Sequence, residues 1–282
     1  MAAEYGLRLA SPADPLTDPQ ALVPPAWRDL MPEGPKAALY FGAEFCEDRL
    51  PDADEAGAFC ARARDEGLAA TLMTPLVSPA GLARTAALLD ALGAGGWRPD
   101  VVFNDWGVLE LLLDRHPSWP RRAGRLLNRS LRDPRAYRDA PQGPATHDVS
   151  RYARVRAHLR ALGVAALESD ADLEGGFLGD GLQAGGEDAL ARALHVPFTY
   201  AASGRGCPLK AALYPDGGGF AKAFAAPCPA PCRGRPQAAP RADSALPHWR
   251  AGNTVFYELP VEAARDWLPR AERIVVHAHA AP

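Results

Sequence analysis

Short apolar runs recur along the chain, and most are followed by a segment in which apolar residues have helical spacing. The run "AALYFG" at 37–42 is typical of a buried strand. The segment at 52–67 then places Ala56, Phe59 and Ala63 on one face of a helix. Strands that alternate with helices in this way predict a parallel sheet built from β-α units.

The alternation continues to the end of the chain and predicts roughly eight strands, the number in a TIM-type (β/α) barrel. One stretch, 189–203, is ambiguous between helix and strand. No predicted strand is followed by G-x-G-x-x-G, which disfavours a dinucleotide-binding fold. We therefore expect an α/β barrel with strands within 7–10, 37–42, 68–75, 100–105, 122–128, 164–169, 253–259 and 273–279.

We expect residues 1–282 to form a single barrel domain that carries a Cys-rich and Pro-rich loop at about 203–247. The sequence stops just after the last strand, which predicts a barrel that is incomplete at the C-terminus. An uncovered last strand would leave apolar surface around Val275 for a partner. The alternative is that the Pro-rich segment Ser11–Lys36 folds back over this strand.

Composition narrows the classes of protein. The chain has 48% hydrophobic and 23% charged residues, which is ordinary for a globular protein, and a formal net charge of -3. The charge offers no argument for nucleic acid or a membrane surface as a partner, and no apolar run has the length of a membrane span. The N-terminus lacks the pattern of a secretory signal, so we expect a cytoplasmic protein without structural disulfides.

Three of the 5 cysteines lie close together, at Cys207, Cys228 and Cys232. Prolines next to each of them keep the backbone out of helix and sheet, as a ligand loop requires. In a TIM-type barrel, functional residues follow the C-terminal ends of strands. Cys46 follows the strand at 37–42 and is therefore the expected fourth ligand at the barrel mouth.

Four thiolates suit a 4Fe–4S cluster or a Cys₄ zinc site. Zinc sites commonly use two short pairs with two to four residues between the cysteines, whereas only Cys228 and Cys232 form such a pair here, and this asymmetry favours the cluster. The other interpretation is that these are inert buried thiols. Cys60 lies next to Phe59 on the helix at 52–67, and we expect it to pack in the core.

Polar residues that follow other strands are candidates for substrate binding: Asn104, Asp105, Arg125, Asn128 and Glu168. Each also has a structural explanation. An Asn or Asp at 104–105 is equally suited to cap the next helix. The arginines could bind carboxylates or phosphates, or form a solvated face. We find no G-x-S-x-G or H-E-x-x-H motif for a hydrolase.

Several of these segments together resemble the U-32 peptidase (collagenase-like) family, and within it the UbiV-type proteins of oxygen-independent ubiquinone biosynthesis. The resemblance covers about Leu7 to Cys232 and is carried by "YFGAEFCEDR", "TLMTPLV", "NDWGVLELL", "GRLLN" and "SGRGC…APCPAPC". It implies a barrel-like fold and a 4Fe–4S cluster on Cys46, Cys207, Cys228 and Cys232.

The same resemblance implies a role in hydroxylation without dioxygen, on a small aromatic or prenylated substrate, as a hetero-oligomer with a UbiU-type family member. A non-catalytic, cluster-bearing partner subunit is the alternative from another class. Peptidase activity is a weaker hypothesis, because a catalytic cysteine would have to be one of the proposed ligands. RNA modification, known among longer relatives, is disfavoured by the acidic charge balance.

Overall fold

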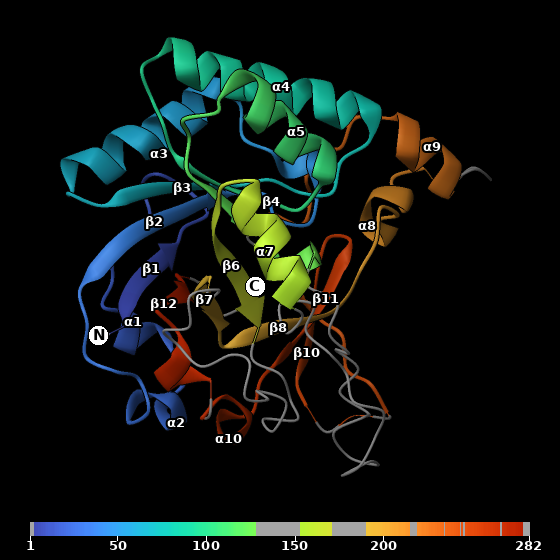
Figure 1. Ribbon diagram of the computed structural model, residues 1–282. Helices are drawn as coiled ribbons and strands as arrows, with labels where there is room; N and C mark the ends of the chain where they lie inside the picture. The colour runs from blue at the N-terminus through green and yellow to red at the C-terminus, as the bar shows by residue number, and fades with distance from the viewer. Residues whose placement is uncertain are drawn as a thin grey trace.

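The computed structural model describes residues 3–127, 153–170, 190–214, 219–233, 235–242, 244, 246–265 and 267–278. Eight strands in these ranges form a closed barrel in the order β1-β12-β7-β6-β5-β4-β3-β2, and every neighbouring pair is parallel. This confirms the predicted TIM-type α/β barrel (Figure 1). The strands are β1 (Glu4–Arg8), β2 (Lys36–Gly42), β3 (Ala69–Met73), β4 (Asp100–Phe103), β5 (Arg121–Ala123), β6 (Val164–Asp170), β7 (Ala191–Val196) and β12 (Arg273–His277).

The strands β2, β3 and β4 are largely apolar because both of their faces are covered. In β2, Ala38 and Tyr40 belong to the cluster that fills the barrel interior, whereas Leu39 and Phe41 belong to the cluster under the helices. All four side chains are fully buried. A strand covered in this way reads as a continuous apolar run, which explains why "AALYFG" is easily recognised from sequence.

Four longer helices lie outside the barrel, and three of them begin at a side-chain cap. Asp52 accepts a hydrogen bond from the backbone of Glu55, and Ser78 accepts one from Gly81, with Pro79 at the first helical position. None of the helices in the described ranges is long and apolar enough to cross a bilayer. The longer helices are α3 (Ala53–Asp65), α4 (Pro79–Ala94), α5 (Trp106–Arg115) and α7 (Ala153–Ala161); the short ones are α1 (Pro19–Leu22), α2 (Pro25–Arg28), α8 (Pro208–Ala211), α9 (Gly219–Ala225) and α10 (Val261–Ala264), with 3₁₀ turns η1 (Glu47–Arg49), η2 (Arg125–Leu127) and η5 (Leu268–Arg270).

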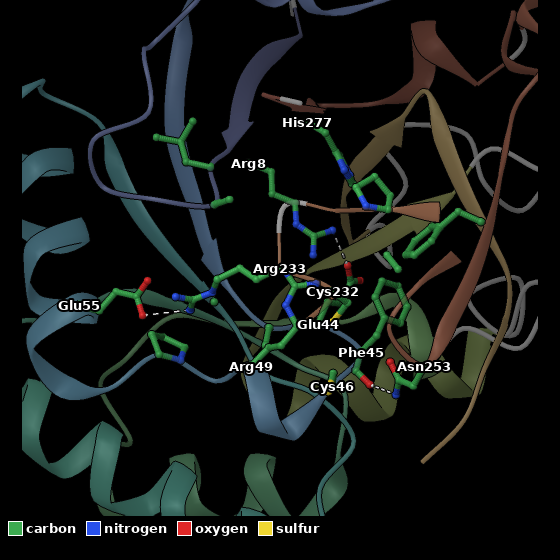
Figure 2. A pocket seen from close by; sticks show the side chains of 18 of the residues that line it. Arg8, Glu44, Phe45, Cys46, Arg49, Glu55, Cys232, Arg233, Asn253 and His277 are labelled. Carbon is green, nitrogen blue, oxygen red and sulfur yellow. Dashed lines mark hydrogen bonds and ion pairs between the residues drawn. The ribbon is translucent and has the colours of Figure 1, made fainter. Parts of the chain in front are cut away.

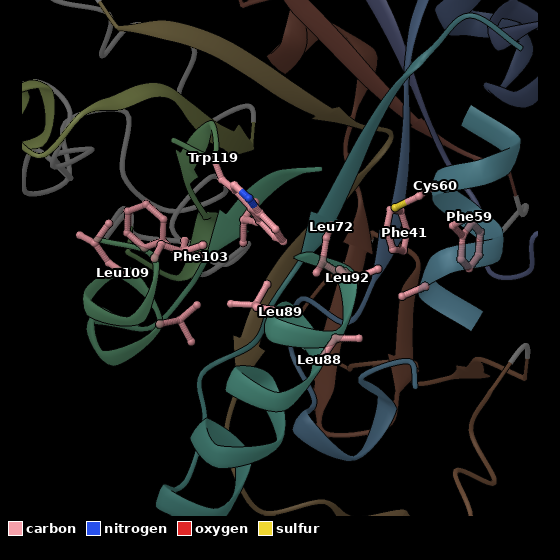
Figure 3. Close-up of a cluster of buried hydrophobic side chains, with 14 of the residues drawn as sticks. Phe41, Phe59, Cys60, Leu72, Leu88, Leu89, Leu92, Phe103, Leu109 and Trp119 are labelled. Carbon is pink, nitrogen blue, oxygen red and sulfur yellow. The ribbon is translucent and has the colours of Figure 1, made fainter. Parts of the chain in front are cut away.

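The largest apolar cluster lies between α3, α4 and α5 and the strands beneath them (Figure 3). Phe41 of β2 stacks on Phe59 of α3 with ring centroids 4.7 Å apart. Cys60, the next residue of α3, is 3% exposed and belongs to the same cluster. The prediction that Cys60 is a core residue is therefore confirmed.

The structure corrects one predicted barrel strand. Residues 253–259 were expected in the barrel, but they form β11 (Thr254–Glu258) of a separate antiparallel sheet of order β8-β11-β10-β9. The ambiguous stretch 189–203 supplies the barrel strand β7 and then β8. Five of the six β7 residues are buried, as a strand covered on both faces requires, whereas β11 leaves Val255 and Glu258 half-buried. The other strands of this sheet are β8 (Phe198–Ser203), β9 (Gln237–Ala238) and β10 (His248–Ala251).

The last barrel strand is covered, contrary to the expectation of an apolar surface around Val275. Val275 is fully buried in the barrel interior. Its neighbours Ile274 and Val276 belong to a buried cluster with Val23 and Trp27, which come from the segment between β1 and β2. The Pro-rich segment therefore folds back over β12, as in the alternative interpretation, and Val275 lies on no exposed surface.

Candidate functional site

Polar side chains at the C-terminal ends of the barrel strands form a closed ionic network. Arg125 donates from Nε to Glu44 Oε1 (2.8 Å), from Nη2 to Glu44 Oε2 (2.5 Å) and from Nη1 to Asp170 Oδ1 (2.5 Å). Arg8 adds a contact of 3.3 Å to Glu44. Arg125 is fully buried. Arg125 therefore joins the end of β5 to the ends of β2 and β6 in one buried ionic group.

Opposite charges keep this network ionised despite its burial. Burial raises the pKa of Glu44, but the charge and hydrogen bonds of Arg125 outweigh that effect and hold the pKa at about 2. Burial lowers the pKa of Arg125, and the carboxylates of Asp170 and Glu44 more than compensate, so its pKa lies above the ordinary value. At neutral pH the two carboxylates are thus balanced by the two guanidinium groups.

A second ionic group lies deeper and is centred on Glu168. Its carboxylate accepts hydrogen bonds from Arg122 Nε (2.5 Å) and from Tyr40 Oη (3.2 Å) on Oε1, and contacts His195 Nε2 (2.8 Å) through Oε2. Burial raises the pKa of Glu168, but Arg122 and His195 hold it at about 2. Burial and the charge of Arg125 lower the pKa of His195, so a neutral ring donates its Nε2–H to Glu168.

These two carboxylates predict acid sensitivity. A buried carboxylate with a folded-state pKa of about 2, below its ordinary value of 4.5, contributes stability that is present above pH 4.5 and is lost as the pH falls towards 2. We expect the unfolding midpoint in urea to fall steeply over this window. Glu168→Gln should flatten the dependence, and an unchanged slope in that variant would contradict the assignment.

The cysteines surround the same mouth. Cys46 follows β2 immediately before η1, and Cys207 is the N-cap of α8, where its Sγ accepts a hydrogen bond of 3.4 Å from Lys210 N. Cys228 and Cys232 follow α9. Cys207 and Cys232 are buried, whereas Cys46 and Cys228 are partly exposed.

Cys46 lies between two pockets. The smaller pocket, about 310 Å³, is lined by Cys46 and Cys232 together with Arg49, Arg233 and Asn253 (Figure 2). The larger pocket, about 900 Å³, contains Cys46 and Cys207 in its wall. The early cysteine is therefore at the same end of the barrel as the late cysteine loop.

The cysteine thiols lie near enough to influence one another. Burial raises the pKa of Cys46 to about 11, and the thiols of Cys232 and Cys207 contribute to the rise. Burial also raises the pKa of Cys232; Arg49 opposes this rise, and Cys207 and Cys228 add to it. These interactions connect all four cysteines that the sequence analysis selected.

The described side chains form no ready-made site for a single metal ion. Among the described residues, no three His, Cys, Asp or Glu side chains converge closely enough to hold one metal ion. A mononuclear zinc site needs four ligands around one atom, at about 2.3 Å for sulfur. In a 4Fe–4S cluster each thiolate binds a different iron, so the four sulfurs stand apart. Binding of a 4Fe–4S cluster by the four selected cysteines stays a prediction.

An ion pair ties two of the cysteine segments together. Lys210 Nζ contacts Asp48 Oδ2 at 2.7 Å, and both side chains are largely buried. Asp48 is two residues after Cys46, and Lys210 is three residues after Cys207. The pair therefore fixes the Cys46 turn against α8.

The larger pocket is apolar at its rim and polar at its base. Trp106 and Phe224 line it and are 54% and 61% exposed, and Leu126 and Tyr200 extend the apolar wall. Glu168 also belongs to the lining but is 1% exposed. A pocket of this size and character suits a ligand with a substantial apolar part.

Two predicted substrate-binding residues form hydrogen bonds with other residues of the chain. Asn104 donates from Nδ2 to Thr74 O (2.9 Å) and accepts from Leu126 N (2.9 Å). Asp105 caps α5 by accepting from Gly107 N (2.7 Å), and its other oxygen accepts from Val77 N (3.2 Å). The capping interpretation of Asp105 is confirmed.

Arg125 and Glu168 are likewise held in the buried ionic groups, and Asn128 lies outside the described residues. Direct substrate contact by any of these candidates stays a prediction. Asn104, Asp105 and Glu168 do line the larger pocket with Cys46 and Cys207, so the structure brings three of the candidates to one end of the barrel.

Sequence reasoning missed His195 and Asn253 as parts of this region. His195 lies in the stretch that was ambiguous between helix and strand, so the burial of its side chain inside the barrel could not be predicted. Asn253 lies in "AGNT", a Gly-Asn pair between two β-prone segments, which is a known signal of a two-residue hairpin turn. That signal was available and predicts a turn at this position.

Comparisons with known proteins give a structural likeness at low sequence identity. No protein-family model matches the chain, and no curated protein matches it. Among solved structures, that of the U32 peptidase Mk0906 aligns with 100% of this chain and 94% of its own, at 14% sequence identity and a TM-score of 0.41. The assignment of the barrel comes from the strand pairing described above.

Proposed function

We propose that this chain is an iron–sulfur protein whose 4Fe–4S cluster is held by Cys46, Cys207, Cys228 and Cys232, and that it is related to the U-32 peptidase family. The observation that carries the proposal is the meeting of Cys46, from the end of β2, with the late cysteine segment at one barrel mouth. The sequence resemblance implies the same four cysteines as cluster ligands.

Bound there, the cluster would supply one-electron transfer. The chain's own residues prepare the site. Lys210 N donates to Cys207 Sγ, and Arg49 favours the thiolate form of Cys232. Hydrogen bonds and positive charges next to the sulfurs stabilise a reduced, more negative cluster. Arg125 and its partners form a buried ionic group at the same end of the barrel.

We further propose, from the resemblance, that the protein is a component of an oxygen-independent hydroxylation that works beside a UbiU-type partner. Replacing a ring hydrogen by a hydroxyl group removes two electrons from the ring. Without dioxygen, the reaction needs another two-electron acceptor or an oxidised hydroxyl donor. The apolar rim formed by Trp106 and Phe224 supports a substrate with an aromatic or prenyl part.

Peptidase activity is the second candidate, and the chemistry of the thiols opposes it. A catalytic cysteine needs a lowered pKa so that the thiolate is populated at neutral pH. Burial instead raises the pKa of Cys46 to about 11 and also raises that of Cys232. Neither thiol is activated in the metal-free protein.

The direct test is metal and sulfide analysis after anaerobic purification. We expect brown protein with iron and acid-labile sulfide in near-equal amounts, about four of each per chain. Absorption of the brown protein should bleach on reduction with dithionite. Stoichiometric zinc without iron in carefully anaerobic preparations would overturn the proposal.

The same preparation distinguishes an enzyme from a cluster-bearing subunit. A hydroxylase component should support hydroxylation of a polyprenylated aromatic ring under argon when the partner is present, and the activity should depend on the cluster. If the iron-loaded protein is not needed for this reaction, it is a cluster-bearing subunit rather than a hydroxylase component. Cleavage of a denatured protein by the cluster-free chain would restore the peptidase hypothesis.

A further inference from the structure

The hairpin between β10 and β11 ends in a two-residue turn made by Gly252 and Asn253. Ala251 pairs with Thr254, so these two residues occupy the central positions of the turn. Gly252 has φ +67°, whereas Asn253 has no positive φ. A turn with positive φ at its first central position only is type II′, which selects glycine there. The turn is therefore rigidly defined by its sequence.

Asn253 joins two cysteine segments that are far apart in the sequence. Its Nδ2 donates to Phe45 O at 2.7 Å and to Gly204 O at 2.5 Å. Phe45 precedes Cys46 directly, and Gly204 lies three residues before Cys207. A carboxamide nitrogen carries two hydrogens, so one side chain satisfies both carbonyl groups. Figure 2 shows Asn253 beside Phe45, with the hydrogen bond drawn.

The other turn residue lies against the third cysteine segment. A Cβ atom built on Gly252 would lie 3.2 Å from Cys232 Sγ, which is tighter than ordinary contact. A side chain at position 252 would therefore press against the thiol of Cys232, and glycine leaves room for it. Asn253 itself lines both pockets that flank Cys46.

We propose that the Gly252–Asn253 turn assembles the cysteine site, and that Asn253 is a positioning residue that holds the Cys46 and Cys207 segments side by side while Gly252 receives Cys232. The inference rests on the proposed function insofar as the assembled thiols bind a cluster. The spacing of the cysteines could not have identified this turn as part of the site, because the turn belongs to the antiparallel sheet rather than to the barrel.

The first test measures thiol proximity in metal-free protein. In a chain whose remaining cysteines are replaced (Cys60→Ala, Cys228→Ser, Cys232→Ser), dibromobimane becomes fluorescent when it bridges Cys46 and Cys207. We expect rapid bridging with Asn253 present. Asn253→Asp removes both donors and sets a charge against two carbonyl oxygens, and bridging should slow by about tenfold or more. Asn253→Ala, which adds no charge, provides a second variant.

Matched controls separate positioning from general damage. Gln237→Glu makes the same amide-to-carboxylate change at an exposed position of β9 and should leave the bridging rate unchanged. Monobromobimane reports that each thiol remains reactive alone, and the thermal midpoint reports the fold. Equal bridging rates in the Asn253 variants and the unsubstituted protein would overturn the inference, as would no bridging in any of them.

The second test uses the anaerobic full chain and iron release to a chelator. Residues that support metal ligands change affinity by about 10- to 100-fold, so Asn253→Ala should release iron correspondingly faster at an unchanged thermal midpoint. The two ideas fail separately. If the protein contains no iron but the bridging rate still depends on Asn253, the cluster proposal is wrong and the role of the turn stands. If the protein binds iron but neither the bridging rate nor the rate of iron release changes in the Asn253 variants, the cluster proposal stands and the role of the turn is wrong.

Discussion

Replacing Cys46 by alanine is expected to abolish iron binding and the brown colour in anaerobically purified protein. Cys46 is separated from the other three thiols by most of the barrel sequence, and it reaches them only because β2 ends at the same mouth. No other cysteine of the chain can replace it there, since Cys60 is buried among the residues between α3 and the barrel. The measurement is iron and sulfide per chain by colorimetric analysis.

Cys60→Ala is the matched control for that prediction. It removes a thiol 14 residues further along the chain from a position that is 3% exposed and packed in the core. We expect full iron content in this variant, with a lowered thermal midpoint because a buried side chain is truncated. Retention of iron in Cys46→Ala, or its loss in Cys60→Ala, would show that the ligand set is wrong.

The barrel was predictable because its strands are covered on both faces. Runs such as Val101–Phe103 in β4 are fully buried and read as continuous apolar segments, and helix caps such as Asp52 and Ser78 mark the elements between them. The exchange of β7 for β11 was not predictable by this rule. The β7 segment is ambiguous between helix and strand, whereas the β11 segment is β-prone, and the partner of a strand depends on contacts far away in the sequence.

The position of the site followed from topology, but its internal partners did not. Placing Cys46 at the mouth requires only that parallel strands end at one side of the barrel. The pairing of Arg125 with Glu44 and Asp170 spans 81 and 45 residues, and nothing local distinguishes Arg125 from the other arginines around it. Sequence reasoning offered Arg125 as a substrate ligand but could not predict that its guanidinium pairs with Glu44 and Asp170.

Arg125→Met is expected to destabilise the protein by about 3–5 kcal/mol, because it removes one partner from a buried ionic group and leaves charge uncompensated. Asp170 would lose its contact of 2.5 Å, and Glu44 would keep only the longer contact to Arg8. Methionine retains much of the packing volume, so the lost charge dominates the result. Equilibrium unfolding in urea measures the change.

The pH dependence separates lost charge from lost packing. In the unsubstituted protein Arg125 holds the pKa of Glu44 at about 2, so the carboxylate stays ionised across the acidic range. In Arg125→Met, burial acts without that counter-charge and raises the pKa, so the carboxylate becomes neutral as the pH falls. The stability difference between the two proteins should therefore be largest near neutral pH and shrink towards pH 4.5, where a packing defect would stay constant.

The exposed ion pair between Arg115 and Asp90 is the matched control. Its distance is 2.9 Å, but both side chains are about half exposed, and pairs of this kind contribute less than about 1 kcal/mol. Arg115→Met should therefore change the free energy of unfolding only slightly and with no comparable pH dependence. If Arg125→Met costs no more than Arg115→Met, the buried ionic group contributes no more stability than an exposed ion pair, and its assigned role is wrong.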